Sequence, residues 1–156
     1  MAGYNQVAVI RWGALAGLGT CLVYPLMIFA PLPTLATVVL AASMGPLLGV
    51  ANWGLREFLN LDRRRPAADL GAACNALGGA LLTAMLLVQL ATGIRSDDKP
   101  GSDAVSIWLG LDVAWDVYVG VGTLLLALCA VRHPRLTVGA GYRRATCAGL
   151  TAFPAL

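Results

Sequence analysis

Long apolar runs alternate along this chain with short polar or proline-rich breaks. Four of the runs are long enough to cross the roughly 30 Å hydrocarbon core of a bilayer as helices. None shows the period-two alternation that is typical of a half-buried strand. The pattern therefore predicts an all-α protein, a transmembrane four-helix bundle formed by residues 1–136, with spans at about Val7–Ala30, Thr34–Phe58, Pro66–Gly93 and Val105–Val131.

The composition excludes an ordinary soluble domain. Of the 156 residues, 58% are apolar and 12% are charged, whereas about 25% of the residues of soluble domains are charged. The basic residues cluster near the ends of the apolar runs, where they set membrane topology. No stripe of basic and aromatic residues predicts a nucleic-acid surface. We therefore expect the lipid bilayer, and no nucleic acid, as a partner.

The loops differ in charge, and this difference predicts an orientation. Pro31–Pro33 carries no charge, whereas the loop before Pro66 contains Arg63–Arg65. Basic loops stay on the cytoplasmic side. With that loop inside, both termini are cytoplasmic, and nine of the eleven basic residues are inside, leaving Arg95 and Lys99 outside. The sequence thus predicts a bacterial inner-membrane protein, N-in and C-in, with a cytoplasmic tail at 137–156 that is interfacial or disordered.

Small residues recur in every predicted span. Because lipid gives helices no hydrophobic reason to associate, small residues favour association by letting backbones approach closely. We expect a tightly packed bundle, and a possible homo-oligomer or larger membrane complex formed through glycine-rich faces. The pattern includes Gly13-x-x-x-Gly17, Gly45-x-x-x-Gly49, an alanine stripe with Gly71 and Gly79 beside it, and Gly120 with Gly122.

Two aspartates lie inside the fourth predicted span. Asp112 and Asp116 are four residues apart, so they lie on the same side of a helix, and we expect a stripe with Gly120 that faces into the bundle. An ionised carboxylate near the midplane costs about 2.5–3.5 kcal/mol on insertion scales. We therefore expect Asp116 to be uncharged unless water reaches it. At similar depths the other spans offer Tyr24, Ser43 and Thr83 as neighbours.

This candidate intramembrane site has two interpretations. Intramembrane acids mark proton, ion or substrate sites in many membrane proteins. Alternatively, the pair hydrogen-bonds to hydroxyl groups and fixes the helix register. A second candidate cluster, on the cytoplasmic side, contains Arg11, Asn52, Asn75 and Asp69. Here Arg11 and Asp69 could form an ion pair and the asparagines could bond across helices, or the residues could act only as interfacial anchors and interhelical contacts.

Catalytic, cofactor and metal motifs are not found. Cys129 and His133 are spaced as two metal ligands would be on a helix, but a structural zinc site needs four. The chain has no H-E-x-x-H, no G-x-S-x-G, no phosphate-binding glycine loop and no dinucleotide fingerprint. We therefore expect no enzyme activity and no cofactor.

The stretches "AMLLVQLATG" (Ala84–Gly93) and "LDVAWDVYVGVGTLLLALCAVRHPRL" (Leu111–Leu136) are similar to those of small bacterial multi-pass membrane proteins without an established activity. This resemblance implies a membrane location only. Two functions remain open from the sequence. The first is a non-enzymatic accessory or structural membrane component. The alternative is a small proton-coupled transporter or carrier that uses Asp112 and Asp116.

Overall fold

The computed structural model describes residues 2–61, 63–94, 102–131, 133 and 136. In this part of the chain it is all-α, with four helices that are each long and apolar enough to cross a membrane. The bounds are close to those predicted, except that the first helix begins earlier, and the predicted tail at 137–156 lies outside the described residues. The helices are α1 (Ala2–Phe29), α2 (Thr34–Leu59), α3 (Pro66–Thr92) and α4 (Asp103–Val131).

Local chemistry explains both ends of α3 and the start of α4. Pro66 occupies the first turn of α3, where a missing N–H costs nothing because helices leave that group unpaired. Gly93 closes α3 with a left-handed φ of 67°, a conformation that glycine adopts without strain. The Ser102 hydroxyl caps α4 by accepting a hydrogen bond of 3.2 Å from the N–H of Val105.

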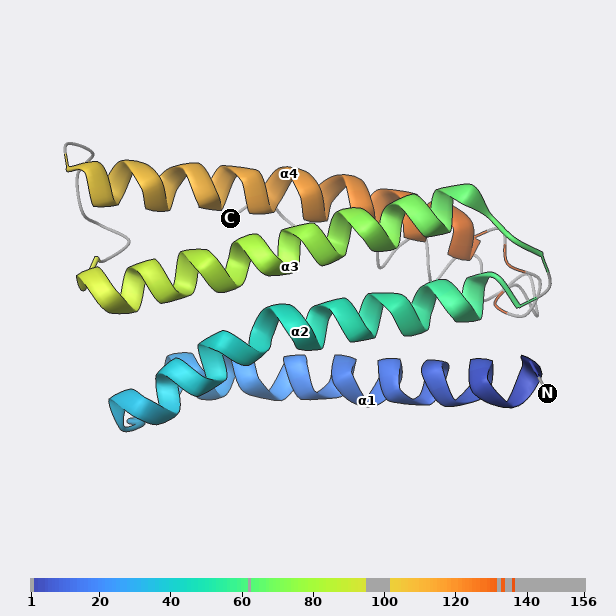
Figure 1. Ribbon diagram of the computed structural model, residues 1–156, viewed down its shortest axis with the longest axis horizontal. Coiled ribbons are helices and arrows are strands. Elements are labelled where there is room, and N and C mark those ends of the chain that lie inside the picture. The colour runs from blue at the N-terminus through green and yellow to red at the C-terminus, as the bar shows by residue number, and fades with distance from the viewer. Residues whose placement is uncertain (1, 62, 95–101, 132, 134–135, 137–156) are drawn as a thin grey trace.

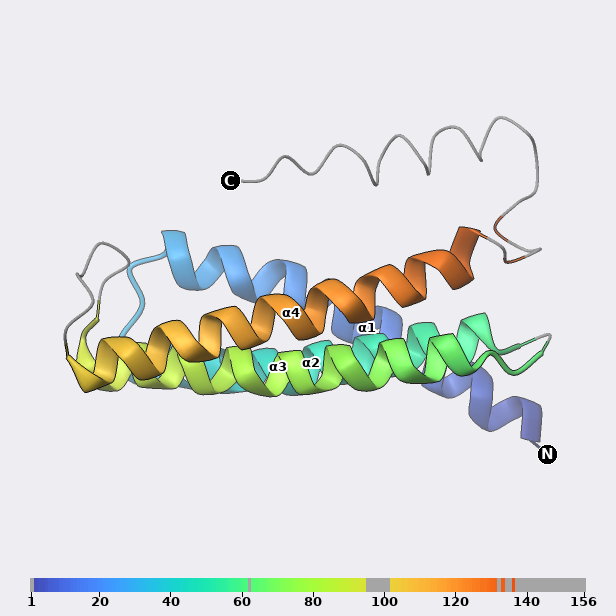
Figure 2. The ribbon, with the colours of Figure 1, turned by 90° about the horizontal axis from the view of Figure 1, so that it is seen from above.

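The helices lie in a row, in chain order (Figure 1). The main packing is between chain neighbours: α1 with α2, α2 with α3, and α3 with α4. Seen from above the row, α1 crosses the other three helices at a clear angle (Figure 2). The two ends of the row, α1 and α4, are not among the main packing pairs.

Each of the three interfaces contains a pair of glycines at a close backbone approach. A Cβ added to Gly13 of α1 would lie 2.5 Å from the Cα of Gly54 in α2. On Gly45 of α2 it would lie 2.5 Å from the carbonyl oxygen of Gly79 in α3. The pair between α3 and α4 is Gly71 and Gly122, where a Cβ on Gly122 would lie 2.7 Å from the Gly71 carbonyl oxygen. These contacts require the absence of a side chain.

The proline inside α2 has a compensating hydrogen bond close to it. Pro46 inside α2 disturbs the helical bonds of the preceding turn, and α2 bends along its course in Figure 1. The N–H of Gly45 donates to the hydroxyl oxygen of Thr83 on α3, at 2.8 Å. A side chain of the neighbouring helix thus satisfies a backbone group near the proline, as membrane helices require.

Candidate functional site

A groove of about 870 Å³ lies between α1 and α4. All four helices contribute to its lining. Its floor includes the buried cluster of Met44 from α2 with Leu82 and Met85 from α3. Tyr24 of α1 and the two tryptophans of α4, Trp108 and Trp115, form parts of its walls. Its volume lies within the range of about 300–1,000 Å³ that is typical of small-molecule sites.

Asp112 is the one ionisable acid that lines this groove. Its side chain is half-buried. No basic residue is among those lining the groove, and among the described residues no hydrogen bond or salt bridge to Asp112 is formed. By rise along α4, Asp112 lies about 7.5 Å from the middle of the helix. The groove therefore presents one carboxylate, without a countercharge among the described residues, near the middle of a helix that is long and apolar enough to cross a membrane.

The other polar groups of the groove are neutral. The Thr20 hydroxyl donates to the Ala16 carbonyl oxygen of its own helix, at 3.0 Å, and the Gln89 amide lies on α3. The indole nitrogen of Trp108 is buried and has no hydrogen-bond acceptor among the described residues. Leaving such a donor unpaired costs about 1–3 kcal/mol. The wall formed by α4 thus combines an aromatic surface with a carboxylate.

Asp116 does not share this position. It is exposed and does not line the groove, so the predicted inward stripe of Asp112, Asp116 and Gly120 is wrong for the single chain. Gly120 is also exposed, with open space around it. Four residues exceed one helical turn by about 40°, and in an open row this rotation carries the side chain from the groove wall to the exposed surface.

Of the three residues predicted to lie near the aspartates, one lines the groove and two do not. Tyr24 lines the groove with Asp112. Ser43 donates to the Leu40 carbonyl oxygen of its own helix, at 2.7 Å. Thr83 lies in the α2–α3 interface, where its hydroxyl accepts the bond from Gly45. The structure therefore brings together Asp112 and Tyr24, and it places Ser43 and Thr83 outside the groove.

The structure also does not bring together all four residues of the second candidate cluster, which was predicted on the cytoplasmic side. The Asn75 amide on α3 donates to the Asn52 amide oxygen on α2, at 2.7 Å, which is the kind of interhelical bond the sequence suggested. Asp69 pairs instead with arginines of α2 and the following loop: Arg56 Nε lies 2.6 Å and Arg64 Nε 2.9 Å from its carboxylate oxygens. The suggested pair of Arg11 with Asp69 is not formed, because these nearer arginines occupy the carboxylate.

The ion pairs of Asp69 belong to a larger network at one end of the row. Asn60 also donates to Asp69, at 3.1 Å, and Arg56 contacts Glu57 as well as Asp69. Gln6 of α1 reaches Glu57, at 3.3 Å. A guanidinium nitrogen of Arg65 donates to the carbonyl oxygen of Cys129 on α4, at 2.9 Å. Residues from all four helices thus meet here, a grouping that spacing along one chain does not reveal.

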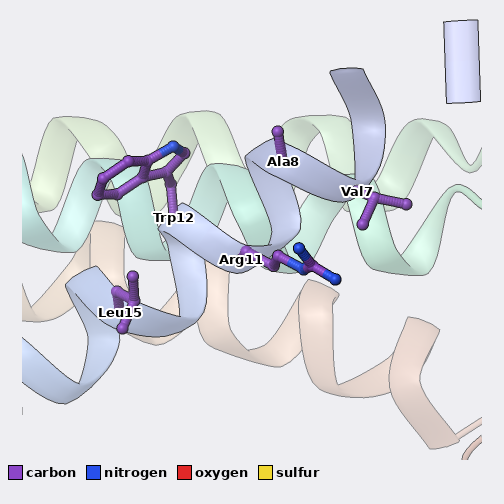
Figure 3. Close-up of a pocket in the computed structure, with 5 residues that line it drawn as sticks. All are labelled: Val7, Ala8, Arg11, Trp12 and Leu15. Atoms are coloured by element: carbon purple, nitrogen blue, oxygen red, sulfur yellow. The ribbon is translucent and has the colours of Figure 1, made fainter. Parts of the chain in front are cut away.

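Arg11 lies elsewhere, in a shallow hollow of about 270 Å³ along α1. Figure 3 shows its side chain extending back along the helix toward Val7, with Trp12 and Leu15 on the next turn. Both Arg11 and Trp12 are exposed. An arginine that lays its stem along an apolar helix and carries its charge toward the helix end is typical of an interfacial anchor. Because only α1 lines the hollow, it offers little to enclose a ligand.

His133 is fully buried and stacks on Phe58, with ring centroids 4.9 Å apart. Cys129 belongs to the same apolar cluster as Leu59 and Leu126. Within the described residues no three His, Cys, Asp or Glu side chains are grouped as a metal site needs. The Cys129–His133 spacing is therefore accounted for by packing at the end of α4.

Comparisons with protein-family models, with curated proteins and with solved structures found no match.

Proposed function

We propose that the protein is a small, non-enzymatic membrane carrier whose working site is the groove between α1 and α4. The observation that supports this function is Asp112, a carboxylate in a ligand-sized groove lined by four helices. Acids inside membrane segments are rare, and they commonly mark proton, ion or substrate pathways. A carboxylate that takes up a proton on one side of the membrane and releases it on the other would carry protons, and a ligand that competes with the proton for the carboxylate would be moved in exchange.

The proposed setting is a bacterial inner membrane with both termini in the cytoplasm, on the basis of the arginine distribution. The groove then lies in the outer half of the bilayer, since the C-terminal part of α1 and the N-terminal part of α4 line it. Single cysteines in a cysteine-free background test this orientation in intact cells. We expect Ser102→Cys to react with an impermeant maleimide, and Arg63→Cys to react only after permeabilisation. The opposite result would invert the topology.

The carrier function is tested with the purified full chain in liposomes that contain a pH-sensitive dye. We expect the wild type to dissipate an imposed pH gradient faster than protein-free vesicles. Asp112→Asn should reduce the rate to that background. Asp116→Asn is the matched control, because it removes the same charge from the same helix at a position outside the groove, and it should keep the wild-type rate. Equal rates for wild type and Asp112→Asn would overturn the proposal.

The second candidate is an accessory or structural membrane component that assembles with further copies of itself through α4. It is favoured by the exposure of Asp116, which lies about 1.5 Å from the middle of α4. A second copy in the same orientation carries its own Asp116 at the same depth, where a protonated carboxyl could bond to its counterpart. Of the eight glycines predicted to mediate packing or assembly, six contact a neighbouring helix within the chain, whereas Gly49 on α2 and Gly120 on α4 are open.

This assembly is tested by co-purification of two differently tagged copies from mixed membranes. Interhelical polar bonds in membranes contribute about 0.6 kcal/mol on average and at most about 1.7 kcal/mol, so Asp116→Leu should weaken self-association by roughly threefold to twentyfold. Asp116→Asn, which keeps a hydrogen-bonding side chain, should lose less. No self-association by the wild type would exclude this candidate and leave the carrier function unaffected.

A further inference from the structure

We infer that the ligand of the groove is a monovalent organic cation of amphipathic character, held by Asp112 among the aromatic side chains of α1 and α4. This inference rests on the proposed function in one respect, namely that the groove binds a ligand at all. It goes further by assigning the charge and the chemical class of that ligand.

The sign of the ligand's charge follows from the lining. Asp112 is the one charged side chain there, and among the described residues nothing neutralises it. In a medium of low dielectric constant an isolated carboxylate is costly unless it meets a cation or takes up a proton. A ligand with one positive charge provides the missing partner. An anion would be repelled by Asp112 and would find no basic group in the lining.

The number of charges follows from the number of ligating groups. A divalent metal ion needs several oxygen ligands or a group of nitrogen and sulfur ligands. Within the described residues no three such acidic, histidine or cysteine side chains come together. One carboxylate matches one ammonium, guanidinium or phosphonium group.

The aromatic walls indicate that this cation is organic. Trp108, Trp115 and Tyr24 line the same groove as Asp112. Indole and phenol faces attract a cation that lies within about 6 Å of the ring centroid, most strongly when the cation is stripped of water. A small, strongly hydrated inorganic ion gains less there than an alkylated cation does.

The remainder of the lining indicates an apolar body. Met44, Leu82 and Met85 form a buried floor, and methionine side chains adapt to irregular ligand shapes. The volume of about 870 Å³ leaves room for a ligand of drug-like size beyond its charged group. An amphipathic cation therefore matches the carboxylate, the aromatic walls and the methionine-rich floor together.

The inference is tested by equilibrium dialysis of the full chain in nanodiscs, with empty nanodiscs of the same lipids subtracted. The probes are tetraphenylphosphonium and tetraphenylborate, which have similar size and shape and opposite charge. We expect the wild type to bind the phosphonium and not the borate. Asp112→Asn should weaken phosphonium binding about tenfold or more, since even a single charge interaction of 1.4 kcal/mol is a factor of ten. Asp116→Asn should remain within twofold.

A groove-filling variant separates failure of the cation assignment from failure of the groove as a site. Thr20→Trp places a large side chain in the groove lining, and Leu22→Trp, at an exposed position of the same helix, is its control. If both ions bind, are insensitive to Asp112→Asn and are lost only in Thr20→Trp, the groove binds apolar ligands and the cation assignment is wrong. If the wild type binds neither ion, the cation assignment is also wrong, and the proton-flux assay decides separately on the carrier function.

Discussion

Replacement of Gly122 by alanine tests the close helix packing most directly. A Cβ at this position would lie 2.1 Å from the amide oxygen of Asn75 and 2.7 Å from the carbonyl oxygen of Gly71. Gly120, two residues earlier on the same helix, has nothing within 4 Å of such a Cβ. Gly120→Ala is therefore a matched control for the same chemical change without the clash.

Three effects set the magnitude for Gly122→Ala. Forcing a methyl group into a packed interface costs about 1–3 kcal/mol. Displacing Asn75 also strains its bond to Asn52, and interhelical bonds of this kind are worth about 0.6 kcal/mol. Against this, alanine is better than glycine in a helix by up to about 1 kcal/mol. We expect a net loss of about 1–3 kcal/mol for Gly122→Ala and a change between zero and a gain of about 1 kcal/mol for Gly120→Ala.

The free energy of unfolding can be measured by steric trapping or by denaturing-detergent titration in bicelles, with both variants against the wild type. A close approach at Gly122 but not at Gly120 requires the two alanine variants to differ in stability. If Gly122→Ala is as stable as the wild type, or if both variants shift by the same amount, the α3–α4 interface does not have the close approach described here. A double variant with Asn75→Ala should recover part of the loss, because it removes the atom nearest to the added methyl group.

Three other predictions concern single contacts. Thr83→Val removes the acceptor for the Gly45 N–H and should destabilise the protein by about 0.6–1.7 kcal/mol in the same unfolding assay, whereas Thr83→Ser should remain near the wild type; equal losses would refute a role for the hydroxyl. Asp69→Asn loses its two arginine pairs and should lower the free energy of unfolding by about 1.5–3 kcal/mol. Arg11 has no ion pair within the described residues, so Arg11→Gln should change that free energy by less than about 0.5 kcal/mol. A larger loss for Arg11→Gln than for Asp69→Asn would contradict a stabilising role of the Asp69 ion pairs. Trp108→Phe removes an unpaired indole N–H, so thermal stability should be unchanged or higher. Phosphonium binding should nevertheless weaken severalfold, because phenylalanine is a poorer cation–π partner than tryptophan. Unchanged phosphonium binding would exclude Trp108 from the site.

The helices could be predicted from the sequence because their signal is strong and local. Each helix corresponds to a run of about 20 or more mostly apolar residues. Pro31–Pro33, Pro66 and Gly93 lie at the ends of these runs, and they place the three connections between the helices almost to the residue. The start of α1 was predicted at Val7, whereas the helix begins at Ala2. Asn5 and Gln6 are too polar to extend an apolar run, but a helix continues beyond the bilayer core without needing apolar residues.

The arrangement of the helices could not be predicted in the same way. Glycine spacing identified Gly13, Gly45, Gly71 and Gly79 as packing positions, and each lies at a close approach. The same spacing also pointed to Gly49 and Gly120, which have open space. A small residue permits close contact on any side of a helix, and only the arrangement of the neighbours decides which sides are used.

The division of the two aspartates has the same origin, and it makes the two candidate functions separable. An inward stripe presumes a closed bundle with one interior, whereas an open row gives α4 a groove wall and an exposed surface about 40° apart. Asp112 lies on the groove wall and Asp116 lies on the exposed surface. Charge removal at Asp112 should therefore change cation binding and leave self-association within twofold, and removal of the polar group in Asp116→Leu should do the reverse. If either variant alters both properties to the same degree, the two carboxylates act as one site, and the α4 surface that carries Asp116 belongs to the ligand path.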